Sequence, residues 1–216
     1  MVKKIYLYAA VITTLIFVVG IVTGYYMSRM EIRGIEDQLY TNQFEMKSLD
    51  MELKVLENLG SESACEYLKE RLPDLARKKT KLANQFQRVS EESAEVLEKE
   101  FAFSLVRYWL FMKIQGEKCD IDKPIVLFFH KKGEELSRQQ GVVLDYWVYK
   151  LREHNESLSV FSFGVGLKES LVDLLKDIYD IDKTPSIVVK EKTYSGLKNR
   201  EKVKEILCDN YNLTIC

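Results

Sequence analysis

This sequence has few prolines, glycines, cysteines and histidines, and almost no net charge. Its 216 residues include three prolines, ten glycines, four cysteines and two histidines. Four cysteines in a chain of this length are too few for a small scaffold held together by disulfides. The formal net charge is −1, which excludes the overall basic field that attracts nucleic acid. We therefore expect one or two modest globular domains and no nucleic-acid partner.

The sequence also lacks the spaced ligands of a metal site. Neither C-x-x-C nor H-x-x-x-H occurs, and such spacings are typical of zinc sites. We therefore expect no metal and no cofactor.

Residues 5–27 form one long run without a charged side chain. As a helix this run would be about 34 Å long, enough to cross the hydrocarbon core of a bilayer. Two tyrosines stand near each end, where amphipathic rings prefer the headgroup level. A cleaved signal peptide is the alternative, but its apolar part would be shorter and small residues would follow it. We expect residues 1–28 to be an uncleaved transmembrane anchor.

The charges that flank this segment slightly favour a cytoplasmic N-terminus, because Lys3, Lys4 and the amino group precede it. Paired cysteines suit an oxidising compartment. Asn155 and Asn212 each begin an Asn-x-Ser/Thr sequon, which would accept a glycan outside the cell. We expect a single-pass protein of the cell membrane whose N-terminus is cytoplasmic and whose C-terminal part is extracytoplasmic.

Residues 29–60 carry the heptad pattern of a membrane-proximal helix. Eight positions alternate in spacing between three and four, and all but Asn42 are apolar: Ile32, Ile35, Leu39, Asn42, Met46, Leu49, Leu53 and Leu56. Gly20 and Gly24 would add a face for close helix contact within the anchor. These features fit a parallel homodimer through anchor and stalk. We favour the alternative, a seam that packs on other helices of the same chain.

Residues 61–118 are predicted to form a helical hairpin. Ser90 is the expected cap of its second helix. If the chain reverses near Ser90, Cys65 and Cys119 come to the same end, where a disulfide between them would close the hairpin. The alternative is one continuous helix over residues 74–115, in which both thiols stay unpaired.

Residues 119–216 alternate between strand and helix patterns. A continuous apolar run predicts a first strand that is buried on both faces. The expected elements are strand 124–130, helix 134–154, strand 158–163, helix 167–179, strand 186–190, a short strand at 193–196 and helix 199–208. This β-α-β-α-β-β-α order gives a mixed sheet with helices on both faces.

This order resembles the thioredoxin fold, and two segments strengthen the likeness. Thr184-Pro185-Ser186 resembles the segment where thioredoxins place a cis-proline facing the active site, and Tyr194-Ser195-Gly196 resembles the segment before their last helix. The arrangement is similar to that of membrane-anchored thioredoxin-like proteins of archaeal type. The resemblance implies an α/β thioredoxin-like domain, preceded by a transmembrane helix and an α-helical hairpin or coiled-coil region. It also implies that Pro185 is cis.

The chain departs from redox-active members of this family at their catalytic motif. Those members carry C-x-x-C after the first strand, where a helix N-terminus stabilises a thiolate. Here Glu134 and Ser137 take these positions, and neither can form a mixed disulfide. A serine needs an oriented base to act as a nucleophile. His130 is the nearest histidine, but at the end of a strand we expect it to be hydrogen-bonded and to have no chemical role. We expect no catalytic residue, and binding through His130, Glu134, Ser137, Thr184 and Pro185.

Cys208 and Cys216 flank the C-terminal tail. A disulfide between them would hold the tail against the last helix. Their spacing resembles no redox motif, so we expect a structural bond.

The sequence thus predicts a redox-inactive thioredoxin-like protein of the cell membrane that faces the cell exterior and binds or scaffolds a protein partner there. The bilayer would be contacted through residues 5–27. One alternative is a thiol–disulfide oxidoreductase or isomerase that uses Cys65, Cys119, Cys208 or Cys216. Another is a stalk or dimer with a purely structural role.

Overall fold

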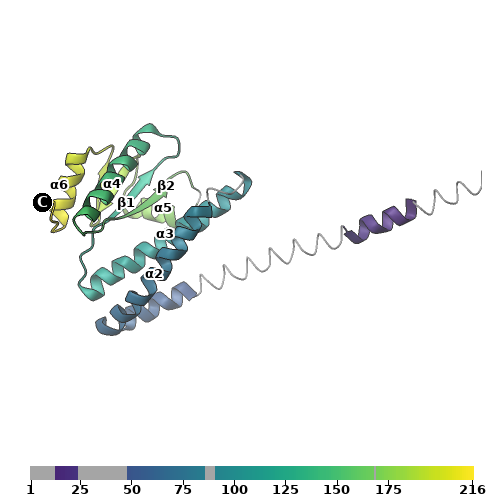
Figure 1. The fold of residues 1–216 in the computed structure, drawn as a ribbon, viewed down its shortest axis with the longest axis horizontal. Helices are drawn as coiled ribbons and strands as arrows, with labels where there is room; N and C mark the ends of the chain where they lie inside the picture. Colours follow the sequence, from purple (N-terminus) through teal and green to yellow (C-terminus); the bar gives the residue numbers. More distant parts are fainter. Residues whose placement is uncertain (1–12, 24–47, 86–90, 168) are drawn as a thin grey trace, which may run out of the picture. The chain divides into compact units, whose positions relative to one another are not determined.

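The computed structural model describes residues 13–23, 48–85, 91–167 and 169–216 (Figure 1). The chain divides into two compact units, residues 1–59 and 60–216. The described residues of the first unit form two helices, at 13–23 and 48–58. All strands and the remaining helices of the described residues belong to the second unit.

The predicted fold class, a thioredoxin-like domain preceded by a transmembrane helix and a helical hairpin, needs correction. The described residues form seven helices and a small four-stranded mixed sheet, and none of these helices is both long and apolar enough to cross a membrane. The described part of the expected anchor is the helix at 13–23, whose side chains are exposed. The other residues of the expected anchor, 1–12 and 24–28, lie outside the described residues.

The predicted heptad helix is described only over its last turns, at residues 48–58. Leu56 is buried there, and Leu49 and Leu53 are half-buried. The earlier positions of the seam, Asn42 included, lie outside the described residues. Neither the homodimer nor the seam within one chain is therefore tested.

The second unit begins with a helical hairpin. Helix α2 spans Ser61–Gln85 and α3 spans Glu91–Cys119 (Figure 1). The buried side chains of α2 recur at helical spacing, and α2 packs along α3: Ala64, Leu68, Leu72, Leu75 and Leu82. A disulfide joins Cys65 to Cys119, whose Cα atoms are 5.5 Å apart. This predicted pair is confirmed, and the alternative of one continuous helix with unpaired thiols is wrong.

The sheet that follows has the strand order β2-β1-β3-β4. The strands are β1 (Ile125–His130), β2 (Ser159–Gly164), β3 (Ser186–Val189) and β4 (Lys192–Ser195). Strand β1 is parallel to β2 and antiparallel to β3, and β4 is antiparallel to β3. The helices between and after them are α4 (Glu135–Glu153), α5 (Ser170–Ile178) and α6 (Arg200–Asn210). The predicted order of strands and helices within residues 119–216 is confirmed.

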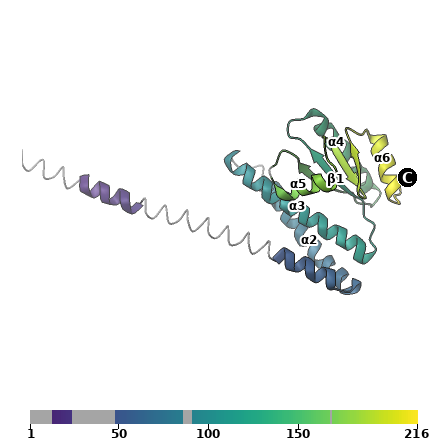
Figure 2. The same cartoon turned by 180° about the vertical axis from the view of Figure 1, so that it is seen from behind.

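Both faces of β1 are buried, as its continuous apolar run predicts. Val126 and Phe128 lie in one cluster with Leu144 and Trp147 of α4 and Val203 of α6. Because side chains alternate along a strand, Leu127 and Phe129 face the other side. There α3 contacts β2 and α5, as seen from behind in Figure 2.

On that second face, aromatic rings connect the sheet with the hairpin. The Phe129 ring of β1 lies 5.6 Å from that of Phe163 in β2, measured between centroids. The Tyr108 ring of α3 lies 5.5 Å from that of Phe161. Such tilted aromatic pairs add to the apolar area that they bury, so α3 is part of the domain's core rather than a separate stalk.

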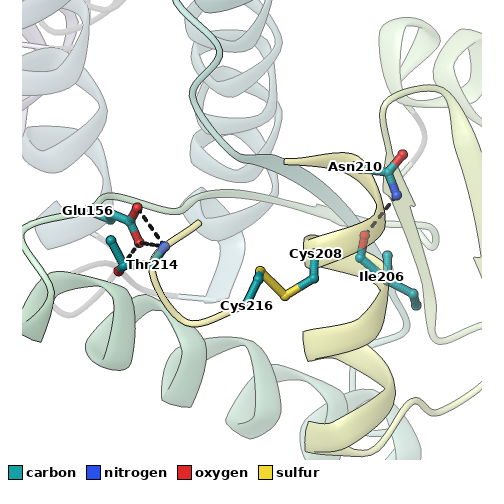
Figure 3. Close-up of a disulfide and its surroundings, with 6 residues drawn as sticks. All are labelled: Glu156, Ile206, Cys208, Asn210, Thr214 and Cys216. Carbon is teal, nitrogen blue, oxygen red and sulfur yellow. Dashed lines mark hydrogen bonds between the residues drawn. A yellow bond between two sulfur atoms is a disulfide. The ribbon is translucent and has the colours of Figure 1, made fainter. Parts of the chain in front are cut away.

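The C-terminal tail is fixed to the domain at several points. A disulfide joins Cys208 to Cys216, the second predicted pair, and the Thr214 amide and hydroxyl donate hydrogen bonds to the Glu156 carboxylate (Figure 3). Between the two cysteines, Tyr211 is buried. Its hydroxyl accepts a hydrogen bond from the backbone N–H of Ile125 at 3.2 Å. The tail thus holds the start of β1 in place.

Removal of the hairpin disulfide (C65S/C119S) should destabilise the protein more than removal of the tail disulfide (C208S/C216S). The bonded residues are 54 apart in the first bond and 8 apart in the second. The chain-entropy model assigns about 4 kcal/mol to the longer loop and about 2.5 kcal/mol to the shorter one. Urea unfolding of both double variants and of the native chain measures the two losses. An equal or reversed order would mean that local packing, not loop closure, sets these losses.

Candidate binding site at the end of β1

The candidate site lies where β1 ends and α4 begins. Residues 131–134 form a tight turn in which the Glu134 amide donates a hydrogen bond to the Lys131 carbonyl at 3.2 Å. Gly133 has a φ of +77°, a conformation that residues with a side chain rarely adopt. The turn places Glu134 at the N-cap of α4 and Ser137 one turn further along the helix.

Glu134 and Ser137, the residues at the expected cysteine positions, bind each other. The Ser137 hydroxyl donates a hydrogen bond to the Glu134 carboxylate. The same oxygen of Ser137 accepts one from the Lys131 amide at 3.1 Å. Ser137 is buried, and Glu134 is half-buried. A carboxylate and a hydroxyl are therefore in direct contact at the N-terminus of α4.

Thr184 brings the proline segment to the same carboxylate. Hydrogen bonds from Ser137 and then Thr184 lower the pKa of Glu134, and the positive charge of Lys131 acts in the same direction. The Thr184–Pro185 peptide bond is cis, as the resemblance implied. Pro185 is buried and immediately precedes β3. The hydrogen-bonded Glu134 thus joins the loop after β1 to the segment before β3.

His130 lies at the edge of this site rather than within its hydrogen bonds. It is half-buried, and burial lowers its pKa although the Glu98 carboxylate has the opposite effect. Its ring lies 5.3 Å from that of Phe128, between centroids. In the part of the chain that the structure describes, no hydrogen bond joins His130 to Ser137. Ser137 therefore has no histidine base there.

Three of the five predicted site residues share a cavity of about 390 Å³. His130, Glu134 and Ser137 line it, while Thr184 and Pro185 do not. Lys131 and Arg138 add positive charge to its wall. The Arg138 guanidinium is paired with the Glu135 carboxylate, which lowers the pKa of Glu135 to about 2. Glu134 is therefore the group through which the cavity and the proline segment are connected.

The four cysteines lie elsewhere in the fold. All are in disulfides, and no free cysteine occurs in the chain. One bond closes the α2–α3 hairpin and the other holds the tail to α6, so neither belongs to the loop after β1. Among the described residues, no group of three or more His, Cys, Asp or Glu side chains is placed to hold a metal ion.

Sequence reasoning missed one contact within the site and one contact that holds the helix carrying it. The Lys131 amide orients the Ser137 hydroxyl. Gln140 is completely buried, and its side-chain carbonyl accepts a hydrogen bond from the Lys198 amide at 2.7 Å, which ties α4 to the segment before α6. The first contact involves the backbone, which no residue pattern marks. The spacing of Glu134 and Ser137, three residues apart in a first helical turn, could have indicated their bond.

No protein-family model and no curated protein matches this chain. Function must therefore be argued from the geometry and chemistry of the site itself.

Ser137→Ala should raise the pKa of Glu134 toward its ordinary value, because it removes the strongest hydrogen bond to that carboxylate. A carboxyl group whose pKa is lowered by folding stabilises the fold above its ordinary pKa of 4.5. That contribution is lost as the pH falls through the folded pKa. Carbon-13 NMR titration of the Glu134 carboxyl in both proteins measures the change.

The carboxyl of Glu191 is the control for this titration. Its pKa is lowered by Lys113 and not by Ser137, so it should titrate identically in both proteins. If the Glu134 titration is also unchanged, the bond to Ser137 does not account for the low pKa.

Proposed function

We propose that residues 119–216 form a thioredoxin-like domain that binds an extended segment of a protein partner and carries out no thiol chemistry. The observation that carries this proposal is the hydrogen-bonded group of Glu134, Ser137 and Thr184. A carboxylate and a hydroxyl occupy the positions at which this domain would need a thiolate in order to exchange disulfides. Because its four cysteines are all in disulfides, we further propose that the domain works in an oxidising, extracytoplasmic compartment.

Two features support the thioredoxin-like part of this proposal. The β-α-β-α-β-β-α order builds a mixed sheet with β1 at its centre, and the loop after β1 opens next to the Thr184–Pro185 segment. Extended segments commonly bind to exposed sheet edges and adjoining grooves through main-chain hydrogen bonds. Here β4 is an edge strand with partly exposed side chains.

The charges around the loop indicate which segments it would favour. Lys131 and Lys132 are exposed, and Leu136 is 47% exposed on the first turn of α4. Glu135 and Arg138 neutralise each other. An extended segment with an apolar residue next to an acidic one would complement this surface.

The alternative oxidoreductase would have to use one of the two disulfides. The structural roles of both bonds, in the hairpin and in the tail, favour the binding function instead.

A single new thiol at the site should trap the partner. In Glu134→Cys, the introduced cysteine would be the only free thiol, because the native four are bonded. We expect this variant to react with synthetic extended peptides in which a cysteine beside an acidic residue is held in a disulfide with thionitrobenzoate. The new thiolate attacks that disulfide, forms the mixed disulfide with the peptide and releases thionitrobenzoate. Glu153→Cys is the matched control, since Glu153 is exposed at the other end of α4 and lines neither this cavity nor any other described one. Equal trapping by both variants would contradict a binding site at the loop.

The double variant Glu134→Cys/Ser137→Cys tests the resemblance itself. It restores C-x-x-C spacing at the N-terminus of α4, where the helix dipole and backbone amides favour a thiolate. The native chain should show no dithiol-dependent insulin reduction, whereas the double variant should gain it. Activity in the native chain would favour the oxidoreductase alternative, and no activity in a correctly folded double variant would contradict the thioredoxin-like proposal.

A further inference from the structure

A second cavity, of about 430 Å³, lies at the opposite end of β1. Leu127 and Val188 form part of its lining and are paired across β1 and β3. Because β1 and β3 are antiparallel, the start of β1 and the end of β3 lie together, away from His130 and Pro185. None of the residues that line this cavity lines the cavity at Glu134 and Ser137.

The walls of this second cavity are mainly apolar and aromatic. Trp109 and Met112 come from α3, Tyr179 follows α5, and Tyr211 comes from the tail. Cavities of roughly 300–1,000 Å³ with apolar walls and a few placed polar groups are typical of small-molecule sites. Four separate segments of the domain thus line a cavity whose size suits a small apolar ligand.

The rim carries charges of both signs, most of them already paired. The Lys113 ammonium lies 2.7 Å from the Glu191 carboxylate, and the Lys190 ammonium lies 3.0 Å from that of Asp122. The Lys190 ammonium also lies 4.5 Å from the centroid of the Tyr211 ring. Both ion pairs join the β3–β4 turn to the wall made by α3 and the segment after it.

Lys123 is the exception among the three lysines of the rim. It lines the cavity and is exposed, and it makes no ion pair with any residue that the structure describes. A ligand carboxylate at the rim would pair with Lys123 without breaking either existing ion pair. The remaining acid of the lining, Glu117, acts electrostatically on the Lys113 ammonium. A ligand ammonium would meet Lys123, which has no counter-charge of its own.

We propose that this cavity binds a medium-chain monocarboxylate, with its apolar chain between Trp109 and Tyr211 and its carboxylate at Lys123. The chain supplies most of the affinity, since each methylene group removed from water should tighten binding about threefold to fourfold. The carboxylate supplies selectivity, because an ion pair at an exposed rim adds at most about fivefold. This site is separate from the proposed peptide-binding loop and does not depend on it.

Fluorine NMR of the full-length chain labelled with 5-fluorotryptophan tests the proposal directly. The protein has two tryptophans, so two signals are expected, and Trp109→Phe assigns them. Hexanoate, octanoate and decanoate should shift the Trp109 signal with affinity that rises along the series. The Trp147 signal is an internal control, because Trp147 is buried between α4 and α6 with its indole N–H bonded to the Arg200 carbonyl.

Two variants locate the ligand. Ile121→Phe places a larger ring in the partly exposed lining and should abolish the shift of the Trp109 signal. Lys123→Gln should weaken octanoate binding about threefold to fivefold and leave octan-1-ol binding unchanged. The thermal unfolding midpoint of each variant confirms that it is folded.

Three results would overturn the proposal. The first is a Trp109 signal that does not move with any of the three acids. The second is a shift that persists in Ile121→Phe, which would place the ligand elsewhere on the chain. The third is that octanoate and octan-1-ol bind with equal affinity and that Lys123→Gln changes neither affinity. The ligand carboxylate would then make no contribution to binding.

Discussion

Burial of β1 on both faces is the constraint on which the rest of the described domain depends. Val126 and Phe128 belong to the cluster with α4 and α6, while Leu127 and Phe129 face the α3 side. A strand buried in this way must satisfy its backbone groups within the sheet, and β1 does so by pairing with β2 and β3. Only its ends reach the surface, which is why both cavities lie there.

At the carboxyl end of β1, the site keeps a negative charge but has no nucleophile. A helix N-terminus favours an anion, whether that anion is a thiolate or a carboxylate. At Glu134 the carboxylate also accepts hydrogen bonds from Ser137 and Thr184, which stabilise its ionised form. Such a group orients neighbouring segments and binds hydrogen-bond donors, but it cannot exchange disulfides. The proposed binding function rests on this chemistry.

Local patterns in the sequence predicted the elements of residues 119–216 and both cysteine pairs, and the resemblance to thioredoxins predicted the cis bond before Pro185. These features depend on residues that are close in sequence or on the order of strands and helices along the chain. The predicted transmembrane helix was wrong, since no helix of the described residues is both long and apolar enough to cross a membrane. The bond between Tyr211 and Ile125 could not be predicted, since it joins residues 86 apart. The second cavity is lined by four segments that are far apart in sequence, so no single sequence pattern predicts it.

The tail closed by the Cys208–Cys216 disulfide contributes to the interior of the domain. Tyr211 contributes to the core beside α6, lines the second cavity and bonds the backbone of Ile125 at the start of β1. It lies between Cys208 and Cys216, and Thr214 is bonded to Glu156 (Figure 3). The disulfide therefore holds one wall of the cavity and one end of the central strand with a single covalent bond, and it does so far from the loop where a catalytic pair would stand.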